Sequence, residues 1–524
     1  MKQSLKNWQA DLSASIVVYL VALPLCLGIG LAATHVKGVE GLPNLYAGII
    51  AGVVGGIVVG FISKSRLGVS GPAAGLITIV LSAIATLGSF EAFLVAVILS
   101  GIIQILAGFL KFGIIGNYFP TAVIKGMLAA IGLTLILKEI PHAFGYDADF
   151  FGDESFFQTD GHNTISELYF MMRSLHPGAI LISILSLVLL LLFESKKLKK
   201  WSVFRVLPGA VIAVIFGIAA NAVLLQFFPE LAIGKKHLVQ LPVLEGMQEL
   251  SSFIHFPDFS FLMQPDVYVI AFTLALVGSL ETLLSVEATD KLDPIKPRTP
   301  TNRELIAQGT GNVVSGLIGG LPITQVIVRS SANITAGGQS KKSTIIHGFL
   351  LAISVLFFPV FLNLIPLASL AAILILVGYK LSAFKLYKSQ YQLGHEQFIP
   401  FVATIMGVLF SDLLIGISIG IAVSIFFILR KNYRNNFTIQ TEEVKGRLQL
   451  VYTLSEEVTF LNKAGILSSL DKVPVNAKVI FDGRKCREID FDVLRAINDF
   501  KDFRAPSKNI DIELIHIKAV QSPI

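Results

Sequence analysis

The sequence predicts an all-α polytopic membrane protein with about 14 transmembrane segments, followed by a small cytoplasmic α/β domain. Hydrophobic residues make up 53% of the 524 residues and charged residues only 15%, whereas soluble domains are about one quarter charged. Apolar runs near the ~20 residues that cross a bilayer recur up to residue 434. From residue 435 the composition becomes that of a soluble domain. We therefore expect a transmembrane domain over 1–434 and a cytoplasmic domain over 435–524.

The apolar runs differ in length, and this difference predicts interrupted helices. The first long run, Leu12–Ala33, follows Lys2 and Lys6 but is too long for a cleaved signal peptide. The other long runs are Ala92–Phe109, Ala179–Phe193, Pro208–Leu225, Tyr268–Ser285 and Leu413–Leu429. The remaining runs, several of them too short to cross alone, are Tyr46–Ile62, Leu67–Ala85, Pro120–Leu137, Leu305–Ile318, Pro322–Ala336, Ile345–Phe361, Ile365–Val377 and Pro400–Phe410.

Basic residues gather in alternate loops, which predicts the topology. The clusters include Lys64 with Arg66, the lysines within 196–200, and Arg430 with Arg434, and the opposite side receives an acidic stretch that holds Asp147, Asp149, Asp153, Glu154 and Asp160. This positive-inside pattern predicts a multi-pass protein of the plasma (inner) membrane with both termini cytoplasmic. The net charge of +6 therefore reports topology and does not indicate a nucleic-acid partner.

Two short segments are interrupted by Gly and Pro: RLGVSGPAAGLITIV (Arg66–Val80) and GGLPITQVIVRSSANITAGG (Gly319–Gly338). Broken helices expose backbone N–H groups at membrane depth, which is tolerated only where they line a cavity. Helix N-termini attract anions. The alternative is that these residues only allow close helix packing. We expect an anion site formed by Ser70, Gly71 and Ala74 from the first segment and by Gln325, Val326 and Ile327 from the second.

Two intramembrane charges accompany these segments. Arg329 would cost roughly 2.5–3.5 kcal/mol at the bilayer centre, so we expect it to supply a positive field behind the anion site. Its alternatives are snorkelling to an interface or a structural ion pair with Glu281. Glu281 follows at least ten uncharged residues and has Ser285 one turn later on the same helix face. These two side chains predict a coupling-ion site, and a purely structural hydrogen bond is the alternative.

Two halves of the chain share a weak repeat. The segments YFPTAVIKGMLAAIGLTL and LIPLASLAAILILVGYKL begin at residues 118 and 364. Pro120 corresponds to Pro366 and Gly132 to Gly378 at identical offsets. Such symmetry is typical of carriers with inverted repeats, although chance similarity between Gly/Ala-rich helices is the alternative.

The sequence holds no catalytic, metal-binding or cofactor-binding pattern. The nine histidines lack the HExxH spacing, and no GxxxxGK[ST] loop is present. Cys26 lies in an apolar run and Cys486 in the polar tail, so both are expected to be ordinary thiols. We therefore expect a protein that is not an enzyme and needs no cofactor or metal.

With these residues in view, the chain resembles the SulP (sulfate permease) family of inorganic anion transporters. The resemblance rests on VALPLCLGIG, GVSGPAAG, GSLETLLS, and NRELIAQGTGN followed by GGLPITQVIVRSSANITAGG. It implies a 7+7 inverted repeat, a homodimer, and an anion held between the third and tenth spans near Ser70 and Gln325. It also implies secondary active transport of a small inorganic anion, sulfate or bicarbonate, by symport or exchange with alternating access.

The resemblance leaves some properties open. Sodium-coupled members carry Asp and Thr where this chain has Glu281 and Ser285, so the coupling cation is Na⁺ or H⁺. The segment KVIFDGRKCREIDFDVLRAI resembles a STAS domain, but the loop Glu488–Asp492 lacks the serine that relatives phosphorylate. A nucleobase permease of the same architecture and an anion channel remain as alternatives.

Overall fold

The computed structural model describes residues 2–34, 45–148, 156, 162–195, 208–241, 254–434, 437–444 and 446–517. The chain divides into two compact units, Met1–Ile421 and Ala422–Ile524. Several residues used for the topology prediction lie outside the described part: the basic cluster at 196–200 and the acidic residues Asp149, Asp153, Glu154 and Asp160. Residue 435, the predicted start of the cytoplasmic domain, also lies outside it.

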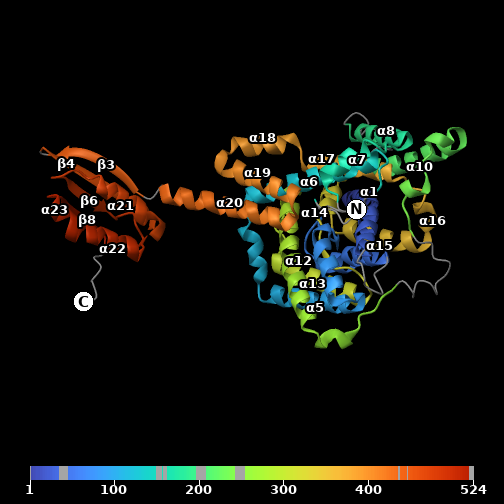
Figure 1. Ribbon diagram of the computed structural model, residues 1–524, viewed down its shortest axis with the longest axis horizontal. Helices are drawn as coiled ribbons and strands as arrows, with labels where there is room; N and C mark the ends of the chain where they lie inside the picture. Colours follow the sequence, from blue (N-terminus) through green and yellow to red (C-terminus); the bar gives the residue numbers. More distant parts are fainter. Residues whose placement is uncertain are drawn as a thin grey trace. The chain divides into compact units, whose positions relative to one another are not determined.

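The first unit is a helical bundle (Figure 1). In the described part of the chain, eight helical segments are long and apolar enough to cross a membrane. They are α1 (Lys2–Ala33), α5 (Phe90–Phe109), α6 (Thr121–Ala143), α8 (Pro177–Glu194), α10 (Gly209–Phe227), α12 (Pro265–Leu292), α17 (Leu367–Leu381) with α18 (Phe384–Gln392), and α20 (Leu413–Arg434), which begins in the first unit and continues into the second.

Shorter helices complete the bundle. The apolar ones are α2 (Tyr46–Val54), which continues through the π-helical turn η1 (Gly55–Val59) into α3 (Gly60–Ile62), then η2 (Ala74–Leu76) with α4 (Ile77–Leu87), α15 (Lys342–Phe357) and α19 (His395–Phe410). The others include α7 (Thr164–Met171), α13 (Thr301–Leu317), α14 (Ile327–Thr335) and α16 (Pro359–Leu362). Two short strands, β1 (Ser70–Pro72) and β2 (Ile323–Gln325), lie among them.

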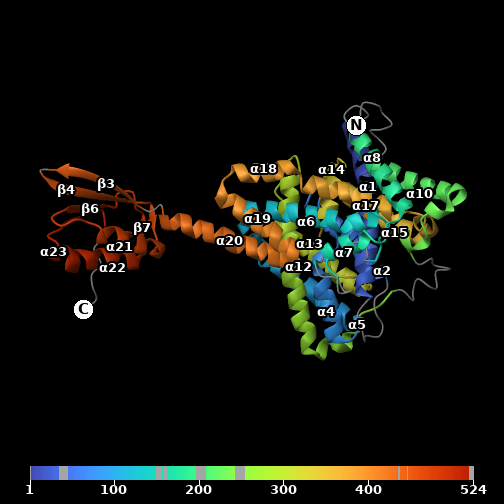
Figure 2. The same cartoon turned by 45° about the horizontal axis from the view of Figure 1, so that its top comes forward.

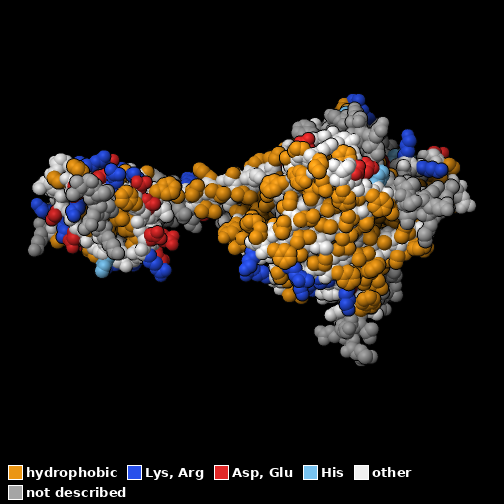
Figure 3. Space-filling model, turned by 90° about the horizontal axis from the view of Figure 1, so that it is seen from below, with side chains coloured by type: hydrophobic (Ala, Val, Ile, Leu, Met, Phe, Trp, Pro, Cys, Tyr) orange, Lys and Arg blue, Asp and Glu red, His pale blue; other side chains and the backbone are white. Residues whose placement is uncertain are grey.

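The surface of this unit is apolar. In Figure 3, hydrophobic side chains cover most of the visible face, and charged side chains lie toward its edges. The most apolar stretches of α8 and α10 are only 33% buried within the protein, whereas that of α1 is 83% buried. An apolar helix with an exposed surface needs lipid as its solvent, so α8 and α10 are peripheral and α1 is central.

Glycines set the closest helix contacts. A Cβ atom built on Gly132 of α6 would lie 2.6 Å from Gly378 O of α17, and one built on Gly378 would lie 2.6 Å from Gly132 O. Gly101 of α5 and Gly309 of α13 meet in the same reciprocal way, at 2.5 Å. Small residues let backbones approach closely where lipid provides no hydrophobic drive for association. The two glycines that correspond in the repeated segments therefore face each other across one helix crossing.

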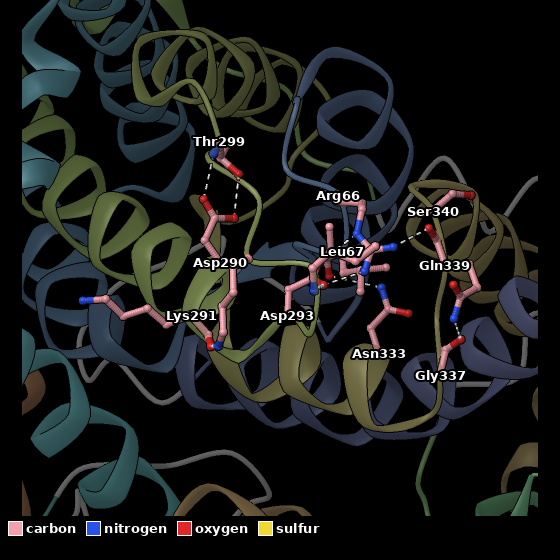
Figure 4. A network of polar contacts seen from close by, with 12 residues as sticks. Arg66, Leu67, Asp290, Lys291, Asp293, Thr299, Asn333, Gly337, Gln339 and Ser340 are labelled. Atoms are coloured by element: carbon pink, nitrogen blue, oxygen red, sulfur yellow. Dashed lines mark hydrogen bonds and ion pairs between the residues drawn. The ribbon is translucent and has the colours of Figure 1, made fainter. Parts of the chain in front are cut away.

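A polar network ties three segments of the first unit together (Figure 4). Arg66, just before β1, donates through Nε and Nη2 to the two carboxylate oxygens of Asp293 after α12, at 2.8 and 2.6 Å. Its Nη1 donates to Gln339 O, beyond α14, at 2.7 Å. Burial opposes the charge of Asp293, but the hydrogen bonds from Arg66 outweigh this effect and lower the pKa of Asp293. The network therefore links the approach to β1 with the ends of α12 and α14.

The second unit is a small α/β fold. Its sheet has the order β3-β4-β6-β8, in which β3 (Phe437–Val444) is antiparallel to β4 (Arg447–Leu454), and β6 (Lys478–Asp482) and β8 (Asp511–Ile515) run parallel to β4. A second pair joins β5 (Glu457–Val458) to β7 (Glu488–Ile489), and the helices are α21 (Lys463–Asp471), α22 (Phe491–Asp499) and α23 (Ala505–Ser507). Tyr452, Phe481 and Ile497 lie in its core. The predicted strands at 448–452, 478–481 and 511–517 are present, and the last one ends earlier, at Ile515.

Candidate functional site

The two interrupted segments meet inside the first unit. β1 and β2 pair antiparallel, with Ser70 opposite Gln325 and Gly71 opposite Thr324. Val326 N also donates to Val69 O at 2.9 Å. A two-stranded ribbon buried among helices satisfies the backbone groups that the broken helices leave without helical partners. Segments separated by about 250 residues in the sequence therefore form one element.

Each strand leads directly into a helix whose N-terminus is uncapped. Ala73 precedes η2 and α4 with φ −108° and ψ 128°, and Val326 precedes α14 with φ −106° and ψ 121°. Neither side chain can accept a hydrogen bond, so in the described part of the chain the first N–H groups of both helices have no side-chain cap. Two helix N-termini with nearly identical geometry thus start from one strand pair, which is favourable for binding an anion.

Amide side chains of α13 hold the strand pair in place. Asn312 donates through Nδ2 to Ile323 O at 3.1 Å and accepts from Ile323 N at 2.6 Å, so its amide replaces a neighbouring strand. Gln308, one helical turn earlier, donates through Nε2 to Ser70 Oγ at 2.7 Å and to the buried Glu304 at 2.9 Å. The Ser70 hydroxyl is therefore directed toward α13, and its contact fixes the position of β1.

Arg329 is fully buried in the first turn of α14. In the described part of the chain, none of its three guanidinium nitrogens bonds an oxygen or nitrogen acceptor, and the Cys26 thiol is its polar neighbour. Its charge acts on the Cys26 thiol of α1 and on His347 of α15, and a Cβ atom on Gly71 would collide with Nη1. The expected alternatives, snorkelling and an ion pair with Glu281, do not fit this placement. Arg329 therefore places a buried guanidinium behind the strand pair, beside Gly71.

Glu281 approaches the other helix N-terminus. A Cβ atom on Gly75, in η2, would lie 3.2 Å from Glu281 Oε1. Glu281 and Ser285 are buried on one face of α12, and the carbonyl of Ser285 accepts from Thr289 Oγ1 at 2.6 Å. Figure 2 shows α12 beside α4 and α5. A carboxylate at this position interacts favourably with the positive helix end and competes with any anion for it.

Two cavities lie beside the helices that follow the two strands, one next to α14 and the other next to η2 and α4. The larger, of about 160 Å³, is bounded by α1, α8, α10, α14 and α17, and the Lys380–Glu194 ion pair lies at its wall. The smaller, of about 30 Å³, is bounded by η2, α4, α6 and α19, and by the turn before α20. Ala74 lines the smaller cavity. In the described part of the chain, no group of three or more His, Cys, Asp or Glu side chains is placed to hold a metal ion.

The predicted site residues fall into three groups. Ser70, Gly71 and Gln325 form the strand pair, whereas Ala74, Val326 and Ile327 lie at the two helix starts, with Arg329 behind them and Glu281 with Ser285 on α12. The sequence reasoning gave no role to Gln308 and Asn312. The sequence could have predicted an interior role for Gln308 and Asn312. Two amides four residues apart on one helix share a face, and polar side chains within the membrane point toward the protein interior.

The fold is that of a helical membrane transporter. It is similar to murine Slc26a9 in the inward-facing state, with a TM-score of 0.66, 16% identity and coverage of 97% of this chain and 86% of that one. It is also similar to the transmembrane domain of a cyanobacterial bicarbonate transporter, BicA, with a TM-score of 0.52, 22% identity and coverage of 80% and 97%.

The sequence profile described as "Sulfate permease family" matches residues 8–404, and the chain belongs to this family. The putative sulfate transporter YvdB of Bacillus subtilis is 29% identical, covering 82% of this chain and 75% of that protein. The bicarbonate transporter BicA of Picosynechococcus sp. is 26% identical, covering 80% and 70%. The predicted family is therefore confirmed.

Proposed function

We propose that this protein is a secondary active transporter of a small inorganic anion, sulfate or bicarbonate, which works by alternating access. The observation that carries the proposal is the strand pair, which brings two uncapped helix N-termini together beside the buried charge of Arg329. Peptide dipoles and a desolvated guanidinium attract an anion without a covalent or catalytic step. The relatives named as sulfate and bicarbonate transporters support these two substrates.

The transport cycle requires two bodies that move against each other. We assign α1–α5 and α12–α15 to a core, and α6–α10 and α17–α20 to a gate. A 7+7 inverted repeat of fourteen spans accounts for which helices pack together. The contact of α1 with α15 corresponds to that of α12 with α5, and the contact of α6 with α19 corresponds to that of α17 with α8. The gate helices that line the two cavities also correspond, with the larger cavity at the end of α14 and the smaller one at the start of η2 and α4.

Glu281 is the proposed coupling residue, together with Ser285. While ionised, Glu281 occupies the positive field of η2 and opposes the anion. A proton or Na⁺ bound at Glu281 removes that opposition, so the anion and the cation are carried together. The positive end of the broken helix thereby makes anion affinity depend on the charge state of Glu281.

We also propose the wider setting of this function. The protein is a homodimer of the plasma (inner) membrane, with both termini cytoplasmic and no nucleic-acid partner. Residues 435–524, within the second unit, form a STAS-like domain: a four-stranded mixed sheet with the helices α21 and α22 supports this assignment. Without a serine in the loop 488–492, the domain acts in assembly and not as a phosphorylation switch.

Uptake of radiolabelled sulfate and of bicarbonate into proteoliposomes tests the proposal, with Na⁺ and pH gradients imposed separately. We expect saturable uptake of one of these anions that is not inhibited by uracil. Inhibition by uracil without competition by sulfate would instead assign the protein to nucleobase permeases. Non-saturable flux that ignores both gradients would assign it to channels.

Two pairs of variants test the site residues. Arg329→Gln removes the buried charge and should abolish uptake, whereas Arg329→Lys keeps a charge and should retain part of it. Glu281→Gln should remove the dependence on the coupling cation, with Glu287→Gln, a half-buried carboxylate paired with Lys291 on the same helix, as the control. Monodisperse elution of each purified variant shows that insertion is intact. Normal coupled uptake by both Arg329→Gln and Glu281→Gln would refute the site.

A further inference from the structure

The smaller cavity has an acidic wall on its gate side. Its volume of about 30 Å³ is enough for a water molecule or a monatomic ion. On the core side it is lined by Ala74, Gly75 and Thr78, at the start of the broken helix. On the gate side it is lined by Ile131, Thr134, Val408, Asp412 and Leu413. The cavity is therefore lined by a carboxylate residue on its gate side and by a hydroxyl residue on its core side.

In the described part of the chain, one carboxylate oxygen of Asp412 accepts a hydrogen bond. Its Oδ1 accepts from Ile415 N at 2.8 Å, which caps the first turn of α20. The backbone carbonyl of Asp412 accepts from Gly416 N at 3.0 Å. The cap leaves Oδ2 available for a ligand, so the same side chain can hold the helix start and coordinate an ion.

Thr134 is the second indication of a ligand. Its hydroxyl is buried, with the residue 8% exposed, and in the described part of the chain Oγ1 has no hydrogen-bond partner although it lines the cavity. A buried hydroxyl without a partner is costly, at about 1–3 kcal/mol, unless something fills the space beside it. The Thr78 hydroxyl lines the same space from α4.

The charges around the cavity favour a cation over an anion. Asp412 lies on one side of Gly75, and Glu281 Oε1 lies 3.2 Å from a Gly75 Cβ position. The N-terminus of the broken helix contributes only about half a positive charge. On α6 the nearest charged residue, Lys138, pairs with Glu167 at 4.0 Å, and α4 carries no charged residue. The Asp412 carboxylate at the cavity wall, with Glu281 beyond Gly75, opposes the half positive charge of the helix N-terminus.

We propose that this cavity is a binding site for a monovalent cation, Na⁺ or H⁺, formed by Asp412, Thr134 and Thr78 at the boundary between core and gate. With H⁺, the proton forms an O–H bond at Asp412 Oδ2 and Thr134 Oγ1 accepts it in a hydrogen bond. With Na⁺, the same oxygens are ligands, as hard cations prefer. The bound cation offsets the repulsion between the gate carboxylate and Glu281, so the core and the gate approach each other on this side only when it is present.

This site rests on the proposed function, since it adds a second cation position to an anion transporter. The experiment measures sulfate and bicarbonate uptake by the full-length protein in proteoliposomes. Na⁺ is varied at constant pH, and pH is varied at constant Na⁺, which identifies the cation. Entry of ²²Na⁺, or acidification reported by a trapped dye, measures the cation directly.

Three variants separate the site from a structural role. Asp412→Asn keeps the helix cap, because Asn caps as well as Asp, and removes only the charge. Its control is Asp258→Asn, which changes another capping Asp away from the cavity. Thr134→Val removes one ligand, and Thr134→Ser restores it.

We expect Asp412→Asn to retain uptake with a weakened dependence on the cation, because Glu281 is still present, while Asp258→Asn behaves as wild type. Thr134→Val should raise the half-saturation concentration of the cation about tenfold, the effect of one lost polar contact, and Thr134→Ser should reverse this. An unchanged cation dependence in both Asp412→Asn and Thr134→Val would overturn the site. Wild-type uptake that responds to neither Na⁺ nor pH would also overturn it, whereas no uptake of either anion would refute the proposed function itself.

Discussion

Replacing Gly132 or Gly378 by Ala tests the helix crossing at the centre of the proposed gate. Each new Cβ atom would lie 2.6 Å from the carbonyl oxygen of the partner glycine, whereas ordinary contacts begin at 3.4 Å. The difference, 3.4 − 2.6, is 0.8 Å, and the atoms in conflict are backbone, which no rotamer change can move. The helices α6 and α17 must therefore separate by about this amount.

The energetic effect follows from two opposing terms. Overpacking of this kind costs about 1–3 kcal/mol. The higher helix propensity of Ala returns about 0.5–1 kcal/mol. We expect each single variant to be less stable by about 1–2 kcal/mol. Because the first substitution already separates the helices, the double variant should lose clearly less than the sum of the two single losses.

The assay is reversible unfolding of the purified protein in mixed micelles with increasing dodecyl sulfate, followed by circular dichroism. Gly234→Ala is the control, because no atom lies within 4 Å of its added Cβ position. Additive losses for the two glycines, or no loss in either single variant, would refute the inference that they contact each other across the crossing.

The remaining predictions concern three other contacts. Gly71→Ala forces the guanidinium of Arg329 aside, so the half-saturation concentration of the transported anion should rise severalfold while protein yield is unchanged; unchanged uptake kinetics would contradict this. Arg66→Met leaves a buried carboxylate after α12 without its partner and should lower the free energy of unfolding by about 2–3 kcal/mol, measured in the same micelles. In the second unit, hydrogen bonds from Arg484 lower the pKa of Asp482 from 3.8 to about 2. A depressed pKa stabilises the folded state above the unfolded pKa, so the stability difference between wild type and Arg484→Met should be present at neutral pH and disappear as pH falls from about 4 to about 2. An NMR titration of the carboxylate and acid unfolding measure it.

Much of the site was predictable because membranes restrict where Gly, Pro and charge can occur. Interrupted apolar runs indicated broken helices, and the structure places Ser70 opposite Gln325, as a site shared by the two segments requires. Arg329 and Glu281 were identifiable because charge is rare in such runs. Their surroundings were not predictable: an Arg329–Glu281 pair was one alternative from the sequence, whereas the guanidinium lies beside Cys26 and Gly71.

The sequence by itself determined the solvent of this protein, its family and the two interrupted segments, because composition and local pattern are sufficient for each. Only the tertiary structure decided which residues contact each other: Gln308 and Asn312 hold the strand pair, Glu281 reaches Gly75, and Asp412 and Thr134 line one cavity. These contacts join helices far apart in the chain, and their distances depend on crossing angles and glycine contacts that no local pattern encodes. Spacing along a helix predicts which side chains share a face, and packing alone selects their partners.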